Sequence, residues 1–152
     1  MRSLLAVTVA AALIALPAHA QTPADSAAIR QAALDYIVGY WEGNGERMER
    51  ALHPELAKRI VRTAPSGQSV IQQMSAMTLT LITRGGGGRM VPAAQRRSDV
   101  RILDIYQNAA SARIDAGQWV DYLHLAKWNG QWKIVNVLWE MRPQPAPPQS
   151  PR

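Results

Sequence analysis

Few side chains in this sequence could carry out metal or nucleophilic chemistry. The sequence has no cysteine and three histidines, and His53 and His124 lie far apart along the chain. No pair of ligating residues has the spacing that a zinc-type site requires. A nucleophilic triad needs a serine on a tight turn between a strand and a helix, and no serine has that setting. We therefore expect neither a metal site nor a bound cofactor.

Aromatic side chains are better candidates for binding a small molecule. Tyr36 and Tyr40 are one helical turn apart, so they share one face of the helix that must position them. That helix is indicated by apolar residues at helical spacing, namely Ile29, Ala33, Tyr36, Ile37, Tyr40 and Trp41. Asp25 or Ser26 can cap its start, and Gly43 ends it. Two tyrosines in this arrangement can serve as ligand contacts or as ordinary core residues.

The rest of the first half predicts short elements. In order, we expect a second helix from Asn44 to His53, a short strand at 59–63, a turn at 64–67, a third helix at 75–83 and a loop at 85–88. Pro54 stops the second helix because proline cannot continue it. Residues 75–83 also alternate like a strand, but their apolar positions fit a helix better.

The second half changes to the alternating pattern of β-strands. We expect strands at 100–105, 109–115, 119–128 and 131–141. Asn129-Gly130 joins the last two and is the strongest short hairpin signal. Helices followed by an antiparallel meander predict an α+β fold, not a parallel α/β fold.

Two segments carry a family resemblance that covers nearly all of residues 26–141. They read ALDYIVGYWEGNGERMERALHPELAKR and ILDIYQNAASARIDAGQWVDYLHLAKWNGQWKIVNVLWE. With the order of elements, they resemble the nuclear transport factor-like superfamily and, within it, the SnoaL-like lumazine-binding family. The resemblance implies a cone-like fold, in which helices pack in the concave face of a bent antiparallel sheet.

The steroid isomerases of this superfamily offer a register that can be compared residue by residue. Tyr36 falls on their oxyanion tyrosine, Ala64 on their general base and His124 on their second acid. A methyl group cannot abstract a proton, so we do not expect steroid-isomerase chemistry. The same register implies that the hairpin face containing His124 points into the cone.

The implied pocket is apolar with a few polar tips, which is typical of a small-ligand site. Its lining would be Tyr36, Tyr40, Tyr122, His124, Val137 and Trp139. Such aromatic walls favour a small planar or apolar molecule. We expect an exported small-ligand binding or accessory protein. A cofactor-independent SnoaL-like enzyme (isomerase, cyclase or hydrolyase) that uses Tyr36 and His124 is the alternative, and a structural or interaction role also stays open.

The opposite face of the hairpin is also apolar in sequence. It would carry Trp119, Leu123, Leu125, Trp132, Ile134 and Leu138. Three helices cannot cover both faces of a sheet, and soluble monomers rarely expose a large apolar patch. We therefore expect a homodimer that forms through this outer sheet face. The alternative is that the tail or the 85–98 loop covers the face within one chain.

The charge of the chain does not indicate a nucleic-acid partner. The formal net charge is +6, but the arginines are scattered along the sequence. From Pro143 to the end the sequence is rich in proline, so we expect an extended or disordered tail. The expected organisation is a leader at 1–20, one α+β domain at 21–142 and a tail at 143–152.

The N-terminus has the three parts of a secretory signal peptide. Arg2 precedes an uncharged apolar run, and Ala18-His19-Ala20 forms a small-residue cleavage site. We expect the mature chain to begin at Gln21 in the periplasm or the extracellular medium, with no membrane span after cleavage. Intact-mass measurement on protein from exporting cells checks this, and an uncleaved Met1 would contradict it.

Overall fold

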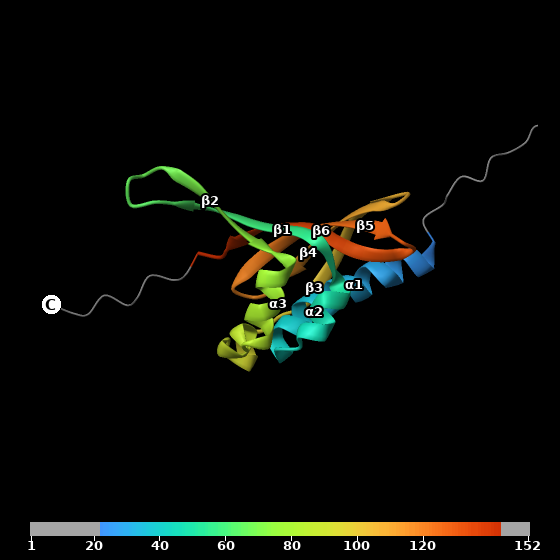
Figure 1. Ribbon diagram of the computed structural model, residues 1–152, viewed down its shortest axis with the longest axis horizontal. Helices are drawn as coiled ribbons and strands as arrows, with labels where there is room; N and C mark the ends of the chain where they lie inside the picture. The colour runs from blue at the N-terminus through green and yellow to red at the C-terminus, as the bar shows by residue number, and fades with distance from the viewer. Residues whose placement is uncertain (1–21, 144–152) are drawn as a thin grey trace, which may run out of the picture.

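The computed structural model describes residues 22–143, in which helices lie against one side of a six-stranded sheet (Figure 1). The predicted signal peptide and all but the first residue of the predicted tail lie outside the described residues. Within residues 22–143, no helix combines the length and apolarity needed to cross a membrane. The α+β fold class is confirmed.

Helix α1, Pro23–Glu42, supplies the longest apolar surface against the sheet. Its cap is Thr22, whose hydroxyl oxygen accepts a hydrogen bond from the Asp25 N–H at 3.1 Å, so neither of the two predicted caps is used. Proline fits the first helical position because its missing N–H would have no helical partner there. Gly43 ends α1 as predicted, in the left-handed conformation (φ 65°) that glycine adopts without strain.

The two shorter helices begin at the residues that the sequence predicts. Asn44 caps α2, Gly45–Ala51, by accepting a hydrogen bond from the Arg47 N–H at 3.0 Å. Ser75 caps α3, Ala76–Arg84, in the same way. The predicted loop after α3 contains two short 3₁₀ turns, Gly87–Met90 and Ala93–Gln95.

The sheet is mixed rather than wholly antiparallel. Its strands are β1 Leu52–Thr63, β2 Ser69–Ser75, β3 Asp99–Tyr106, β4 Ala109–Asp115, β5 Trp119–Trp128 and β6 Gln131–Met141. Their spatial order is β2-β1-β6-β5-β4-β3, and only the β1–β6 pair is parallel. The meander from β3 to β6 is confirmed. The sequence did not predict β2, and β1 begins at Leu52 rather than at residue 59.

The β5–β6 hairpin turns at Asn129-Gly130 as predicted. Both residues have positive φ angles, 48° and 77°, which a two-residue type I′ turn requires. Farther from the turn, the pairing shifts from Leu125 with Ile134 to His124 with Asn136. Val135 is therefore an extra residue in β6, and this bulge changes which β6 side chains face the helices.

The predicted orientation of β5 is wrong. Asp121, Leu123 and Leu125 are buried beneath the helices, whereas Tyr122 and His124 are exposed on the other face. Alternation separates the two faces of a strand but does not identify the inner one when both are largely apolar. A shift of only one residue in an alignment reverses every side chain of a strand, so the register taken from the steroid isomerases was not enough to identify the inner face.

The predicted dimer surface is also misplaced. Of its six residues, Trp119, Leu123, Leu125, Trp132 and Ile134 are buried in the core. Only Leu138 is on the outer face, where it is half exposed. The helices cover the residues that were expected to need a partner, so the outer face is less apolar than predicted. The oligomeric state itself stays a prediction.

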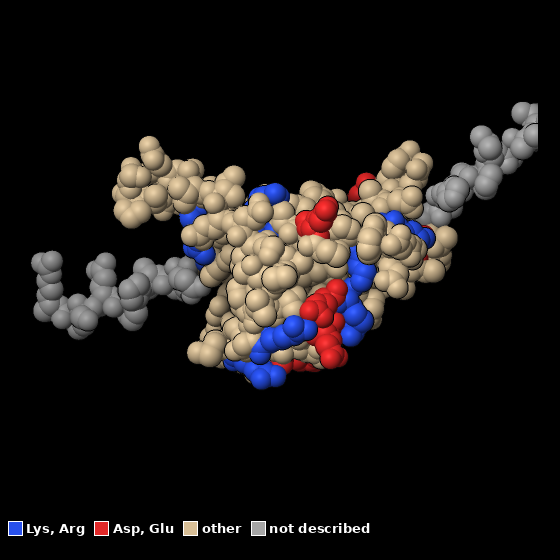
Figure 2. Space-filling model, in the orientation of Figure 1, with Lys and Arg blue, Asp and Glu red and all other residues tan. Residues whose placement is uncertain are grey.

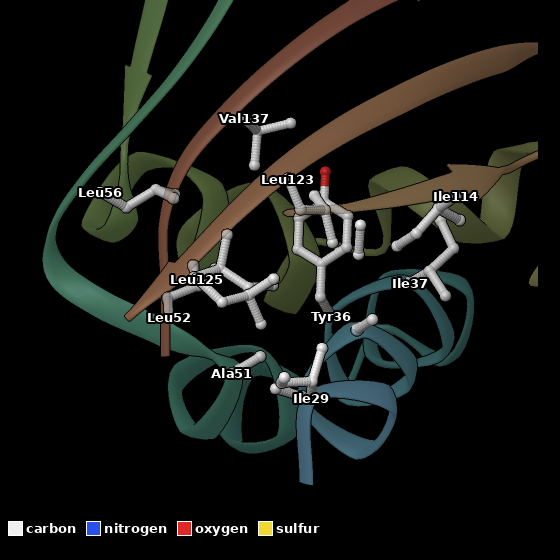
Figure 3. Close-up of a cluster of buried hydrophobic side chains, with 14 of the residues drawn as sticks. Ile29, Tyr36, Ile37, Ala51, Leu52, Leu56, Ile114, Leu123, Leu125 and Val137 are labelled. Atoms are coloured by element: carbon white, nitrogen blue, oxygen red, sulfur yellow. The ribbon is translucent and has the colours of Figure 1, made fainter. Parts of the chain in front are cut away.

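The core forms where α1 and α2 meet the inner face of the sheet. Figure 3 shows Ile29, Tyr36 and Ile37 of α1 directed toward Leu123 and other apolar side chains of the sheet. Burying one such side chain contributes roughly 1.5–3 kcal/mol. On the face shown in Figure 2, basic and acidic side chains are interspersed over the helices and do not form one basic patch.

Candidate functional site

A cavity of about 280 Å³ lies between the helices and the inner face of the sheet. Helix α1 contributes Tyr36 and Tyr40, β1 contributes Lys58, β5 contributes Trp119 and β6 contributes Trp139. The other lining residues are mostly aliphatic or methionine: Ile37, Met48, Met74, Leu79, Ile82, Val91, Gln118 and Met141. The cavity therefore has apolar, aromatic walls with a few polar groups.

A buried ion pair lies at the cavity wall. Lys58 Nζ donates hydrogen bonds to Asp121 Oδ1 and to the Tyr36 hydroxyl oxygen, both at 2.6 Å. Trp119 Nε1 donates to the second carboxylate oxygen of Asp121 at 2.8 Å. Trp119 and Asp121 are two residues apart on β5, so they share its inner face. The Asp121 carboxylate is fully buried, and Lys58 is only 5% exposed.

Burial dominates the electrostatics of this group. It lowers the pKa of Lys58 against the opposing effect of the Asp121 carboxylate. It raises the pKa of Tyr36 well above the ordinary tyrosine value, and the charge of Asp121 adds to that increase. Tyr36 is therefore a neutral hydroxyl at physiological pH. Both side chains are almost fully buried, so the Lys58–Asp121 pair is retained only because each charge has a close partner.

Beside the pair, the Trp119 ring contacts three other aromatic rings. The Trp119 ring lies 5.1 Å from Trp41, 6.0 Å from Tyr40 and 6.4 Å from Trp139, all between ring centroids. Lys58 Nζ lies 4.8 Å from the Trp139 ring centroid, within the range of a cation–π contact. Within residues 22–143, Trp139 Nε1 is a buried side-chain donor without a hydrogen-bond partner.

The structure brings together three of the six predicted lining residues, Tyr36, Tyr40 and Trp139. Val137 is fully buried in the core and does not line the cavity. Tyr122 and His124 are on the outer face of the sheet, so Tyr36 and His124 cannot act on one substrate. The contact of any of these residues with a ligand stays a prediction.

The exposed His124 belongs to a polar cluster outside the cone. Its Nδ1 lies 3.2 Å from Asn136 Nδ2, and Asn136 Oδ1 accepts a hydrogen bond from Arg59 at 3.0 Å. These three side chains come from three neighbouring strands. Across residues 22–143, no three side chains that could ligate a metal are grouped together.

Sequence reasoning missed Lys58 as a site residue, and it placed Trp119 and Asp121 on the outer face of the sheet instead of in the pocket. A signal was present, because Lys58 lies between Leu56 and Ile60 in an alternating strand and occupies an inward position. Asp121 has the same setting in β5. A lysine and an aspartate at two apolar positions indicate a buried pair, because lone charges are almost never fully buried.

Three helices against a six-stranded mixed sheet form the α+β fold of NTF2-like proteins, as comparison with solved structures shows. An NTF2-like protein of unknown function from Shewanella baltica aligns with a TM-score of 0.62 at 20% identity, and the alignment covers 82% of this chain and 99% of the other. One from Methylobacillus flagellatus aligns with a TM-score of 0.60 at 21% identity, covering 82% and 97%. Similarity at these identities establishes the fold alone.

The family follows from the sequence of the same domain. Residues 24–140 match the family described as "Putative lumazine-binding", and the chain belongs to that family. A search of curated proteins found no match. An NTF2-like protein with a cystatin-like fold from Novosphingobium aromaticivorans is also similar, with a TM-score of 0.57 at 12% identity, covering 81% of this chain and 85% of the other.

Proposed function

We propose that this protein binds a small planar heteroaromatic molecule in the cavity between its helices and its sheet. The observation that carries the proposal is the combination of aromatic walls with a buried polar group, formed by Lys58, Asp121 and Tyr36, at one side of the cavity. Sites for small ligands have this composition, in which apolar walls give affinity and a few polar atoms fix the orientation.

The unpartnered N–H of Trp139 supports a ligand that carries a hydrogen-bond acceptor. A buried donor without a partner is costly, so a ligand whose acceptor reached this N–H would gain affinity. The cavity volume of about 280 Å³ is just below the usual range of roughly 300–1,000 Å³, which favours a compact ring system. Lumazine, a two-ring heterocycle with carbonyl groups, fits this description and the description of the family.

Lumazine should quench the tryptophan emission and raise the melting temperature of the protein. Trp119 and Trp139 line the cavity with their rings at 74° to each other, so a ligand ring stacked on one indole would lie close to the other. A ligand at one hundred times its Kd adds about 2.7 kcal/mol to the free energy of unfolding. Fluorescence titration and a thermal shift assay measure the two effects. No change in either signal at millimolar lumazine would contradict the proposal.

Two neighbouring residues of β2 give a matched control for this experiment. Met74 lines the cavity, whereas Gln73 belongs to the opposite face of the same strand. Met74→Trp should fill the cavity and abolish the lumazine-dependent shift. Gln73→Trp adds the same side chain outside the cavity and should keep the shift. Equal loss in both variants would place the ligand elsewhere.

We also propose that the protein acts outside the cytoplasm and forms a homodimer, both from the sequence pattern. The outer face retains Leu138 opposite Tyr122 and Val61 opposite Ile71, and each is 47% exposed or more. A second copy packed on these four side chains would remove them from water. These four side chains replace the dimer surface first expected from the sequence. The proposed twofold contact is still on the outer face of the sheet.

A further inference from the structure

Lys58 differs from the other lysines of this chain in its surroundings. The sequence contains three lysines, Lys58, Lys127 and Lys133. Lys127 pairs with Asp25 near the surface, and Lys133 donates to a backbone carbonyl at the end of α2. Lys58 alone lines the aromatic cavity, with its ammonium group buried. A lysine in an apolar cavity is the usual setting of an amine that reacts with carbonyl groups.

The partners of Lys58 Nζ can manage the protons of such a reaction. Asp121 Oδ1 is 2.6 Å away and can accept a proton from the ammonium group. The transfer leaves a neutral amine beside a neutral carboxylic acid, which removes both charges from two side chains that are almost fully buried. The lowered pKa of Lys58, caused by burial, favours the same transfer. The Tyr36 hydroxyl, also 2.6 Å from Nζ, can donate a proton to a developing alkoxide.

We propose that Lys58 captures aromatic aldehydes or ketones as an imine inside the cavity. The proposal rests on the proposed function, because the same aromatic walls must admit the ring of the carbonyl compound. Trp139, whose ring centroid lies 4.8 Å from Nζ, would lie beside the ring of the captured compound. No other amine of residues 22–143 lines this cavity.

The reaction balances without an oxidant or a reductant. Asp121 takes a proton from Lys58, and the free amine forms a bond to the carbonyl carbon. The carbonyl π pair moves to the oxygen, which takes a proton from the Tyr36 hydroxyl. The Lys58 nitrogen, now bonded to the carbonyl carbon, then gives one of its two protons back to Tyr36. Asp121 gives its proton to the hydroxyl group on the former carbonyl carbon, and this group leaves as water. The product is a protonated imine, whose positive charge keeps its partner in the Asp121 carboxylate.

Reductive trapping tests the proposal on the whole mature protein. The protein is incubated with 2-naphthaldehyde at neutral pH and reduced with sodium borohydride, which converts any imine to a stable secondary amine. Peptide mass mapping then measures the occupancy of each lysine. We expect at least tenfold higher occupancy at Lys58 than at Lys127 or Lys133. Equal labelling of the three, or labelling only at the surface lysines and the N-terminus, would overturn the proposal.

Two variants and a competitor sharpen the test. Lys58→Arg keeps a positive charge near Asp121 but has no amine that forms a stable imine, so the cavity adduct should disappear. Lys127→Arg is the matched control and should keep it. Lumazine should protect Lys58 and leave the surface lysines unchanged. A lumazine-dependent thermal shift without an adduct at Lys58 rejects imine formation alone, whereas an adduct without any lumazine effect rejects lumazine binding alone.

Discussion

Asp121→Ala should lower the free energy of unfolding by about 3–5 kcal/mol, one of the two largest effects expected in this protein. The variant removes the carboxylate from a fully buried site and leaves Lys58, which is only 5% exposed, without its counter-ion. It also removes the acceptor of the Trp119 N–H. Urea unfolding followed by tryptophan fluorescence measures the change.

Removing both charges together is the control for this prediction. The double variant Lys58→Met, Asp121→Leu has no buried charge, so it should be more stable than Asp121→Ala. Glu49→Ala breaks a pair with Arg84 in which both side chains are half exposed, and it should cost about 0–1 kcal/mol. A cost for Asp121→Ala as small as that for Glu49→Ala would show that the Lys58–Asp121 pair is not buried.

The pH dependence of the variants follows from the direction of the Lys58 pKa shift. Burial lowers the pKa of Lys58 in the folded state below its ordinary value of 10.5. At pH values between the lowered pKa of Lys58 in the folded state and its pKa of 10.5 in the unfolded state, the unfolded chain binds more protons than the folded one. The free energy of unfolding therefore rises with pH in this window. The loss of Asp121 removes the opposing effect and widens this window. The difference in free energy of unfolding between Asp121→Ala and the double variant should therefore shrink as the pH rises toward 10.

Leu125→Ala should lower the free energy of unfolding by about 2–5 kcal/mol, whereas Leu138→Ala should change it by less than about 1 kcal/mol. The two leucines are on adjacent strands, but Leu125 is 2% exposed and Leu138 is 50% exposed. Both substitutions delete the same atoms, and the two positions differ in the face of the sheet on which the side chain lies. Urea unfolding of both variants at one protein concentration measures the difference. The orientation of β5 first expected from the sequence puts both leucines on the outer face, so similarly small effects in the two variants would support it.

Most of the element order was predictable because the signals are local. Asn44 and Gly43 mark helix ends through their own side-chain and backbone preferences, and Asn129-Gly130 makes its turn without long-range help. Strand β2 was missed for the opposite reason. It is an edge strand whose side chains are nearly all exposed, so no buried face leaves an apolar alternation in its sequence.

The length of β1 was also hidden from local signals. The second helix was expected to continue to His53, next to Pro54, but it ends at Ala51 and β1 begins at Leu52. The pairing of β1 with β6 is irregular between Leu52 and Ala57, so the missing N–H of the proline does not break a regular ladder. A parallel contact between β1 and a strand at the other end of the chain leaves no pattern in either segment alone.

The sequence by itself determined the three helices, the meander from β3 to β6 and the α+β class, because caps, turns and periodicity depend on neighbouring residues. Only the tertiary structure decided which face of the hairpin is inside, since both faces are largely apolar and the bulge at Val135 changes the alternation of β6. The tertiary structure also brought the residues of the candidate site together. Lys58 and Asp121 are 63 positions apart, and their charges are tolerated only where the fold places them 2.6 Å from each other.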